Sequence, residues 1–231
     1  TSGGNIVHGD DGPDTITVNS TGNHIYGDNG IDYITQAVNG NDVIEGGNDV
    51  DHITVASSNA WRVNGGNDND IITIGSFNSD VNGGGDADKI SAGDKNKIHG
   101  GNGNLGENAD SSDTIQANNS NLIYGDAGID SITVHDTNTV YGGDGTKNYG
   151  SDDKDSIYGN DGNKIYGGRG TDSIVVRHHN YVEGNNDSDG IIAEDYNRIL
   201  GGGDNDSIIA SEYNTVSGGS NISIADNDDG G

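Results

Sequence analysis

Aspartate recurs along this chain of 231 residues at steps of 17–19 residues, with two longer steps of 25. The recurring residues are Asp14, Asp32, Asp51, Asp70, Asp88, Asp113, Asp130, Asp155, Asp172, Asp189 and Asp206. Carboxylate oxygens are the ligands of hard divalent cations, and Ca²⁺ takes 6–8 oxygen ligands in flexible geometry. A regular row of aspartates therefore suggests calcium chemistry.

Stacking of these aspartates has an electrostatic cost. At the spacing of neighbouring β-strands, about 4.8 Å, two carboxylates repel by roughly 3.5 kcal/mol at an effective dielectric constant near 20. Ten such contacts would exceed the roughly 5–15 kcal/mol that stabilises a typical domain. The row must be protonated, spread into water or bridged by cations, and at neutral pH we expect bridging by Ca²⁺.

The aspartates belong to a repeated unit, N-x-Φ-x-G-G-x-G-x-D-x-I-x-Φ, in which Φ is Ile or Val. The first Φ of the twelve copies is Val7, Ile25, Ile44, Val63, Val81, Ile98, Ile123, Val140, Ile165, Val182, Ile199 and Val216. A fixed period this short indicates a solenoid. Each unit contains two short alternating stretches, typical of strands, joined by a glycine-rich turn. We predict an all-β fold, a parallel β-roll or β-solenoid of about twelve two-strand coils of 17–19 residues each.

We expect residues 1–231 to form one such solenoid, with two insertions near 103–112 and 146–154. Both insertions fall between the glycine pair and the aspartate, so we expect loops that protrude from one edge. Alternation directs the first Φ and the Ile after each Asp inward, as ladders of Ile and Val. This core is thin, because apolar residues make up 29% of the chain, against about 45–50% in an ordinary domain.

The turns resemble those of a known family. The segments Gly167–Ile174, Gly46–Ile53 and Gly201–Ile208 follow the pattern G-G-x-G-x-D-x-U-x, and the repeat covers nearly the whole chain. This is the nonapeptide of the RTX-type (hemolysin-type) calcium-binding β-rolls of secreted bacterial proteins. The resemblance implies Ca²⁺ between consecutive coils, held by the aspartate row and by turn carbonyls.

The resemblance also implies further carboxylate ligands where aspartate replaces the glycine at the fourth position of the motif. These residues are Asp49, Asp68, Asp86, Asp187 and Asp204. The family has two nonapeptides per coil, whereas this chain has one, and its opposite turn is built around Asn. We therefore expect several Ca²⁺ ions in one row along one edge, with stacked Asn residues in a structural role on the other.

Composition excludes several classes of function. A net charge of −28 disfavours nucleic acid and anionic membrane surfaces as partners. The chain has no cysteine and no stretch that approaches the roughly 18 apolar residues of a membrane helix. Motifs such as H-E-x-x-H, G-x-S-x-G and the P-loop do not occur, so we expect no enzymatic activity.

The favoured function is that of a secreted, extracellular or cell-surface structural protein that Ca²⁺ folds and stiffens. It would be a subunit or segment of a bacterial surface layer, filament or adhesin, and would self-associate end to end. The main rival function is that of an accessory calcium-binding module of a secreted polysaccharide-active enzyme. Ice binding through a Thr row (Thr17, Thr35, Thr54) and carbohydrate binding through a Tyr row (Tyr124, Tyr141) are also compatible with the sequence.

Overall fold

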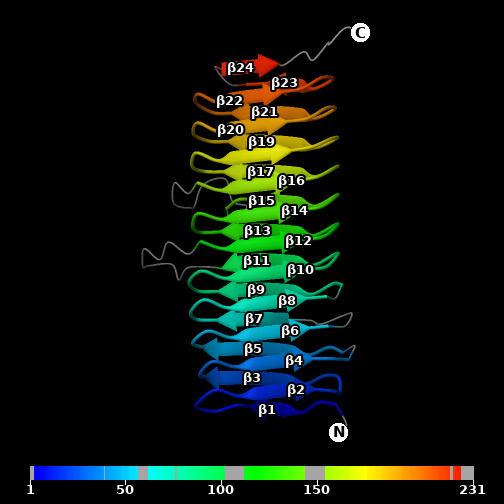
Figure 1. Ribbon diagram of the computed structural model, residues 1–231, viewed down its shortest axis with the longest axis vertical. Coiled ribbons are helices and arrows are strands. Elements are labelled where there is room, and N and C mark those ends of the chain that lie inside the picture. Colours follow the sequence, from blue (N-terminus) through cyan, green and yellow to red (C-terminus); the bar gives the residue numbers. More distant parts are fainter. Residues whose placement is uncertain are drawn as a thin grey trace.

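The computed structural model describes residues 3–38, 40–56, 62–75, 77–101, 112–143, 154–218 and 221–224. Within them the chain winds as a solenoid whose two faces are parallel 12-stranded sheets, as Figure 1 shows. Strands β1 and β24 lie at opposite ends of the stack. The predicted all-β solenoid of stacked parallel coils is therefore confirmed.

Odd-numbered strands form one sheet, called sheet A. They are β1 (Ile6–His8), β3 (His24–Asn29), β5 (Val43–Asn48), β7 (Arg62–Gly66), β9 (Asp80–Gly84), β11 (Lys97–Gly101), β13 (Leu122–Asp126), β15 (Thr139–Tyr141), β17 (Lys164–Gly168), β19 (Tyr181–Asn185), β21 (Arg198–Gly202) and β23 (Thr215–Ser217). Each strand contains the first Φ of its repeat unit.

Even-numbered strands form the opposite sheet, called sheet B. They are β2 (Thr15–Val18), β4 (Tyr33–Gln36), β6 (His52–Val55), β8 (Ile71–Ile74), β10 (Lys89–Ala92), β12 (Thr114–Ala117), β14 (Ser131–Val134), β16 (Ser156–Gly159), β18 (Ser173–Val176), β20 (Gly190–Ala193), β22 (Ser207–Ala210) and β24 (Asn221–Ile224). Each begins directly after the recurring aspartate, or at the corresponding position in β24.

The strand register is constant along the stack. Ile90 of β10 pairs with Ile115 of β12, and Ile132 of β14 pairs with Ile157 of β16. Each of these pairs spans a 25-residue step, so the inserted residues leave the register of the sheets unchanged. The insertions predicted near 103–112 and 146–154 lie outside the described residues, apart from Ser112 and Lys154.

The core is the pair of Ile and Val ladders that the alternation predicts. The Φ residues from Ile25 to Ile199 and the post-aspartate Ile residues from Ile34 to Ile208 are at most 1% exposed. A third ladder of smaller residues, such as Val55 and Ala117, completes the interior of sheet B. β-Branched side chains suit this pleated surface, and each coil packs only on its neighbours. None of the described elements is a helix long and apolar enough to cross a membrane.

Candidate metal site along the aspartate edge

All eleven predicted aspartates lie at one edge of the solenoid, where the glycine-rich turn enters sheet B. Asp14, in the first coil, is half-buried. The other ten are at most 2% exposed: Asp32, Asp51, Asp70, Asp88, Asp113, Asp130, Asp155, Asp172, Asp189 and Asp206. The structure therefore brings the predicted residues together in one row and turns their side chains inward, away from solvent.

One oxygen of each of these ten carboxyl groups is used by the backbone. The N–H of each aspartate donates to Oδ1 of the aspartate in the next coil, from Asp14 to Asp32 at 2.8 Å and on to Asp189 and Asp206 at 3.1 Å. The intervening distances lie between 2.7 and 2.9 Å. The row is therefore a continuous ladder in which side chain and backbone alternate, and it holds neighbouring coils together.

The second oxygen, Oδ2, is different. It is buried and has no hydrogen-bond partner at Asp32, Asp51, Asp70, Asp88, Asp113, Asp189 and Asp206. A buried polar atom without a partner costs about 1–3 kcal/mol, and more where the group is charged. A line of such atoms demands either protons or cations.

Each Oδ2 faces the first glycine of its own turn. A Cβ on Gly65 would lie 2.2 Å from Oδ2 of Asp70 and 2.4 Å from the carbonyl oxygen of Gly83 in the next coil. Gly46 has the same surroundings, with Oδ2 of Asp51 at 2.4 Å and the carbonyl oxygen of Gly65 at 2.3 Å. Carboxylate and carbonyl oxygens thus converge where a side chain would otherwise stand, which requires glycine there.

This donor set fits the cation that the sequence implies. Every atom offered is a hard oxygen, and Ca²⁺ accepts mixtures of carboxylate and carbonyl oxygens. The part of the chain that the structure describes contains no cluster of three or more His, Cys, Asp or Glu side chains placed to hold a metal ion. Because the carboxylates form a line rather than a cluster, the aspartate row and the turn carbonyls together would hold the ions.

We predict that Gly65→Ala destabilises the protein by at least about 2 kcal/mol, because overpacking costs typically 1–3 kcal/mol and here the new methyl group also displaces a buried carboxylate. Gly85→Ala is the matched control, since its nearest neighbours lie 3.9 Å from the added Cβ. Thermal unfolding by circular dichroism compares the two. Equal melting temperatures would contradict the close packing of Asp70 on Gly65.

Burial also changes the protonation of the row. It raises the pKa of Asp51, Asp70, Asp113 and Asp189 from the ordinary value of 3.8 to about 7, and that of Asp88 to about 8. The largest cause is loss of hydration, to which neighbouring carboxylates add, while the backbone N–H bond to Oδ1 acts in the opposite direction. Protons would therefore compete near neutral pH with any cation that binds these carboxyl groups.

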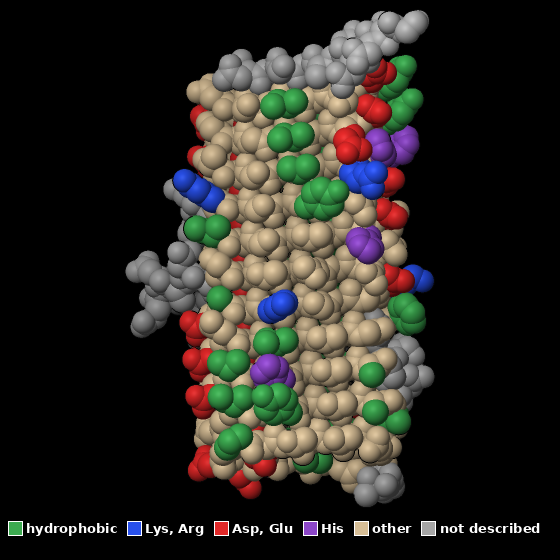
Figure 2. Space-filling view, in the orientation of Figure 1, with side chains coloured by type: hydrophobic (Ala, Val, Ile, Leu, Met, Phe, Trp, Pro, Cys, Tyr) green, Lys and Arg blue, Asp and Glu red, His purple; other side chains and the backbone are tan. Residues whose placement is uncertain are grey.

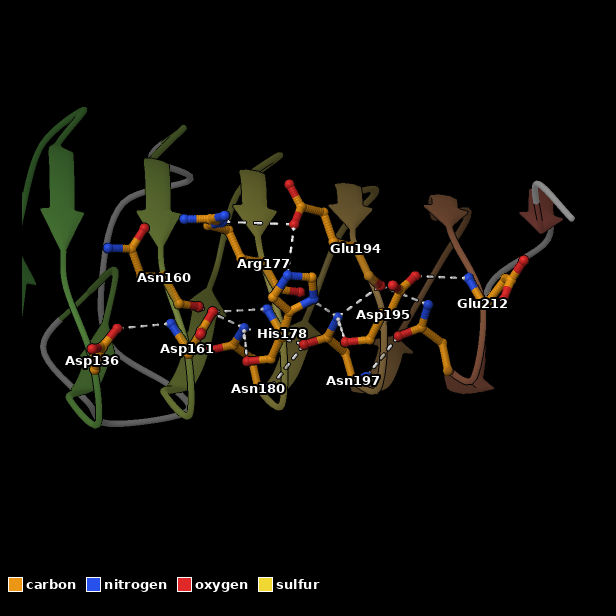
Figure 3. A network of polar contacts seen from close by, with 11 residues as sticks. Asp136, Asn160, Asp161, Arg177, His178, Asn180, Glu194, Asp195, Asn197 and Glu212 are labelled. Atoms are coloured by element: carbon orange, nitrogen blue, oxygen red, sulfur yellow. Dashed lines mark hydrogen bonds and ion pairs between the residues drawn. The ribbon is translucent and has the colours of Figure 1, made fainter. Parts of the chain in front are cut away.

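The opposite edge shows how the same geometry is satisfied without ions. There Asn residues form a parallel row, and the N–H of Asn180 donates to Oδ1 of Asn197 at 2.7 Å. Nδ2 of Asn180 donates to the carbonyl oxygens of Asn160 at 2.8 Å and His178 at 3.0 Å, as Figure 3 shows. The two rows differ in one atom of the side chain. In the Asn row this atom is an amide nitrogen that finds acceptors, whereas at Asp51 and Asp70, for example, it is a carboxylate oxygen without a hydrogen-bond partner.

Sequence reasoning assigned the Asn row a structural role but missed its equivalence to the Asp row. The sequence does indicate that the two rows are equivalent. Both residues stand two positions before a buried β-branched residue, as in Asn163-x-Ile165 and Asp172-x-Ile174. In the third coil the position is taken by Asp42, which accepts the N–H of Asn23 at 2.6 Å.

The second set of predicted ligands lies elsewhere in the turn. Asp49, Asp68, Asp86, Asp187 and Asp204 have φ angles between 60° and 73°. Their side chains are exposed, except for the half-buried Asp187. Glycine occupies the same turn position in other coils, for example Gly30 at φ 123°. Asp tolerates this left-handed conformation better than most residues. Two of the side chains also accept backbone hydrogen bonds from the preceding coil, Asp68 from the N–H of Asp49 at 3.1 Å and Asp187 from the N–H of Gly170 at 3.2 Å. The role of the five residues as ligands stays a prediction.

The predicted Tyr row runs along the outer face of sheet A as a stack of rings. Tyr141 lies 5.1 Å from Tyr124 and 4.9 Å from Tyr166 between ring centroids, with interplanar angles of 8° and 9°. His99 continues the stack beyond Tyr124 at 4.6 Å. The rings in this stack cover one another's faces, which leaves mainly their edges for contact with a sugar. Cross-strand aromatic packing is therefore the observed role of the row.

Comparison with family models, with curated proteins and with solved structures finds no match for this chain.

Proposed function

We propose that the protein is a calcium-stabilised structural solenoid of the extracellular space, a subunit or segment of a bacterial surface layer, filament or adhesin. One observation supports it most directly: a line of buried aspartates, in which the Oδ2 atoms of Asp32, Asp51, Asp70, Asp88, Asp113, Asp189 and Asp206 have no hydrogen-bond partner. The uniform stack of coils supports a structural role, because every coil repeats one supersecondary unit.

Calcium would make folding depend on whether the protein is inside or outside the cell. A cation that binds the folded chain and not the unfolded one stabilises the fold in proportion to its concentration. Low calcium inside a cell would leave the charge of −28 to hold the chain open, and high calcium outside would neutralise the row. The aspartates would act as ligands, with turn carbonyls completing the coordination. End-to-end association, expected from the sequence, stays a prediction.

Equilibrium dialysis at pH 8 tests the proposal. We expect several Ca²⁺ ions bound per chain and a melting temperature that rises with calcium concentration. Mg²⁺ is the control, because it requires stricter octahedral geometry and dehydrates reluctantly, so we expect a much smaller rise. A folded chain that binds no Ca²⁺ at millimolar concentration would overturn the proposal.

A further inference from the structure

Over strands β2–β22, whose side chains the structure describes, the outer face of sheet B carries no carboxylate, although the chain contains 38 acidic residues. In each strand from β2 to β22 the first and third residues point outward. The first column is Thr15, Tyr33, His52, Ile71, Lys89, Thr114, Ser131, Ser156, Ser173, Gly190 and Ser207. The second column is Thr17, Thr35, Thr54, Thr73, Ser91, Gln116, Thr133, Tyr158, Val175, Ile192 and Ile209.

Figure 2 views this face. Acidic side chains gather at its margins and lower end, while hydrophobic side chains form a column over the upper strands. Tyr158, Ile192 and Ile209 are 41%, 50% and 47% exposed, and the register places them in line with Val175. In a molecule this acidic, a face without carboxylates and with an apolar column is a surface on which a like-charged molecule can approach with little repulsion.

The two columns change size in opposite directions along the stack. In β4–β10 the first column is bulky and the second consists of Thr and Ser. In β16–β22 the first column consists of Ser and Gly and the second is bulky and apolar. The middle strands, β12 and β14, have Thr, Ser and Gln in both columns. If the order of the strands is reversed about the middle of the face, bulky positions in each column therefore fall on small ones.

We propose that a second copy of this chain packs its sheet B against this face, with the two solenoids antiparallel. The two-fold axis would run along the strand direction between β12 and β14, which gives an isologous contact. First-column contacts would then pair large with small residues: Tyr33 with Ser207, His52 with Gly190, Ile71 with Ser173 and Lys89 with Ser156. Second-column contacts would do the same: Ile209 with Thr35, Ile192 with Thr54, Val175 with Thr73 and Tyr158 with Ser91.

The size of the face suits a stable dimer. The ten strands β4–β22, about 4.8 Å apart and four residues wide, cover about 48 by 13 Å, or about 1,250 Å² counted over both partners. Specific protein–protein interfaces bury about 1,200–2,000 Å². Interdigitation of large and small residues is also how two aligned sheets pack face to face.

Charge selects the antiparallel arrangement over the parallel one. A two-fold axis along the solenoid would also set bulky residues against small ones, but it would place both Lys89 side chains at the same level of the stack. In the antiparallel arrangement the two lysines lie apart, and each approaches the level of Tyr158 in the other copy. An ammonium group over an aromatic ring contributes about 0.5–1 kcal/mol or more.

Sedimentation equilibrium of the full chain in millimolar Ca²⁺ tests the interface. We expect twice the mass of 23.7 kDa for the wild type and a mass halved to the monomer for Ile209→Glu. Ile129→Glu is the matched control, since Ile129 is also 47% exposed but lies in a turn, and it should stay dimeric. Circular dichroism confirms that each variant is folded. A folded monomeric wild type, or equal masses for the two variants, would overturn the proposal.

Cross-linking tests the orientation, and the absence of natural cysteine makes it unambiguous. A mixture of His52→Cys and Gly190→Cys chains should form a disulfide-linked dimer on mild oxidation, whereas neither variant alone should. Space exists at Gly190, where the nearest atom lies 3.7 Å from an added Cβ. Cross-linking of His52→Cys with Thr54→Cys instead would indicate the parallel arrangement and overturn the antiparallel one.

Discussion

Metal-free protein is expected to lose its β-sheet circular dichroism at pH 8 and to keep it at pH 4. Five buried aspartates, among them Asp70 and Asp88, have pKa values of about 7 or 8 in the folded chain, against 3.8 when exposed. The folded state therefore binds more protons than the unfolded state between these values. Stability is fully present below about pH 4, falls as the pH rises above that value, and reaches its minimum once the pH exceeds 7–8.

The expected loss of stability is large because the contributions of several buried aspartates in the row add up. A shift of about three units at one carboxyl corresponds to about 4 kcal/mol once the pH exceeds the folded-state pKa. Three such carboxyls would cancel the roughly 5–15 kcal/mol of an ordinary domain. Thermal melts between pH 4 and 8 measure the trend, and millimolar Ca²⁺ should restore the fold at pH 8. Metal-free stability that does not change between pH 4 and 8 would contradict protonation of the row.

The substitution Asp88→Asn is expected to make the stability of the fold less dependent on Ca²⁺. Its amide oxygen can still accept the N–H of Asp70, now 2.7 Å from Oδ1, while the buried ionisable oxygen is replaced by a neutral donor. Without metal at pH 8 the variant should be more stable than the wild type by at least about 1 kcal/mol, or about 2–4 °C in melting temperature for a chain of this size. In millimolar Ca²⁺ the order should reverse, because one carboxylate ligand is lost.

The reciprocal change on the opposite edge is the control. Asn121→Asp places a carboxylate in the Asn row and removes the amide donor that now bonds Oδ1 of Asn138 at 3.1 Å. We expect a loss of at least about 1 kcal/mol at pH 8. Calcium should restore less of this loss than it restores to metal-free wild type, because a single carboxylate has no row of neighbours. A stabilising effect of Asn121→Asp would contradict the distinction between the two edges.

The architecture could be predicted from the sequence because the periodicity of the repeat is visible in the sequence itself. Steps of 17–19 residues between Φ positions correctly predicted coils, and alternation around Ile34 or Ile53 correctly predicted which residues are buried. The register is unchanged across the step from Ile90 to Ile115, while the insertions predicted near 103–112 and 146–154 lie outside the described residues. Local pattern and global fold agree in this chain, which is what makes such reasoning effective.

The details of the edge could not be predicted, because they depend on distances between coils. Spacing placed Asp32 above Asp14 but could not show that the backbone N–H of Asp14 occupies one oxygen of Asp32. Nor could it show that glycine makes room for the other oxygen, as Gly65 does for Asp70. The left-handed backbone at Asp49 and Asp68 was likewise hidden, because a carboxylate at that position suggests a ligand before it suggests a turn.

The stacking order has a mechanical consequence. Each coil pairs only with its two neighbours, and β1 and β24 stand at opposite ends, so the hydrogen bonds between coils lie along the long axis (Figure 1). A pulling force applied to the two ends would load these bonds in sequence, so that the junctions between coils would open one after another. The aspartate ladder crosses the junctions between successive coils, from Asp14 to Asp206. Ca²⁺ bound there, as proposed, would raise the force at which each junction opens. The solenoid would then extend in small steps, one coil at a time, and its resistance would increase with the calcium concentration.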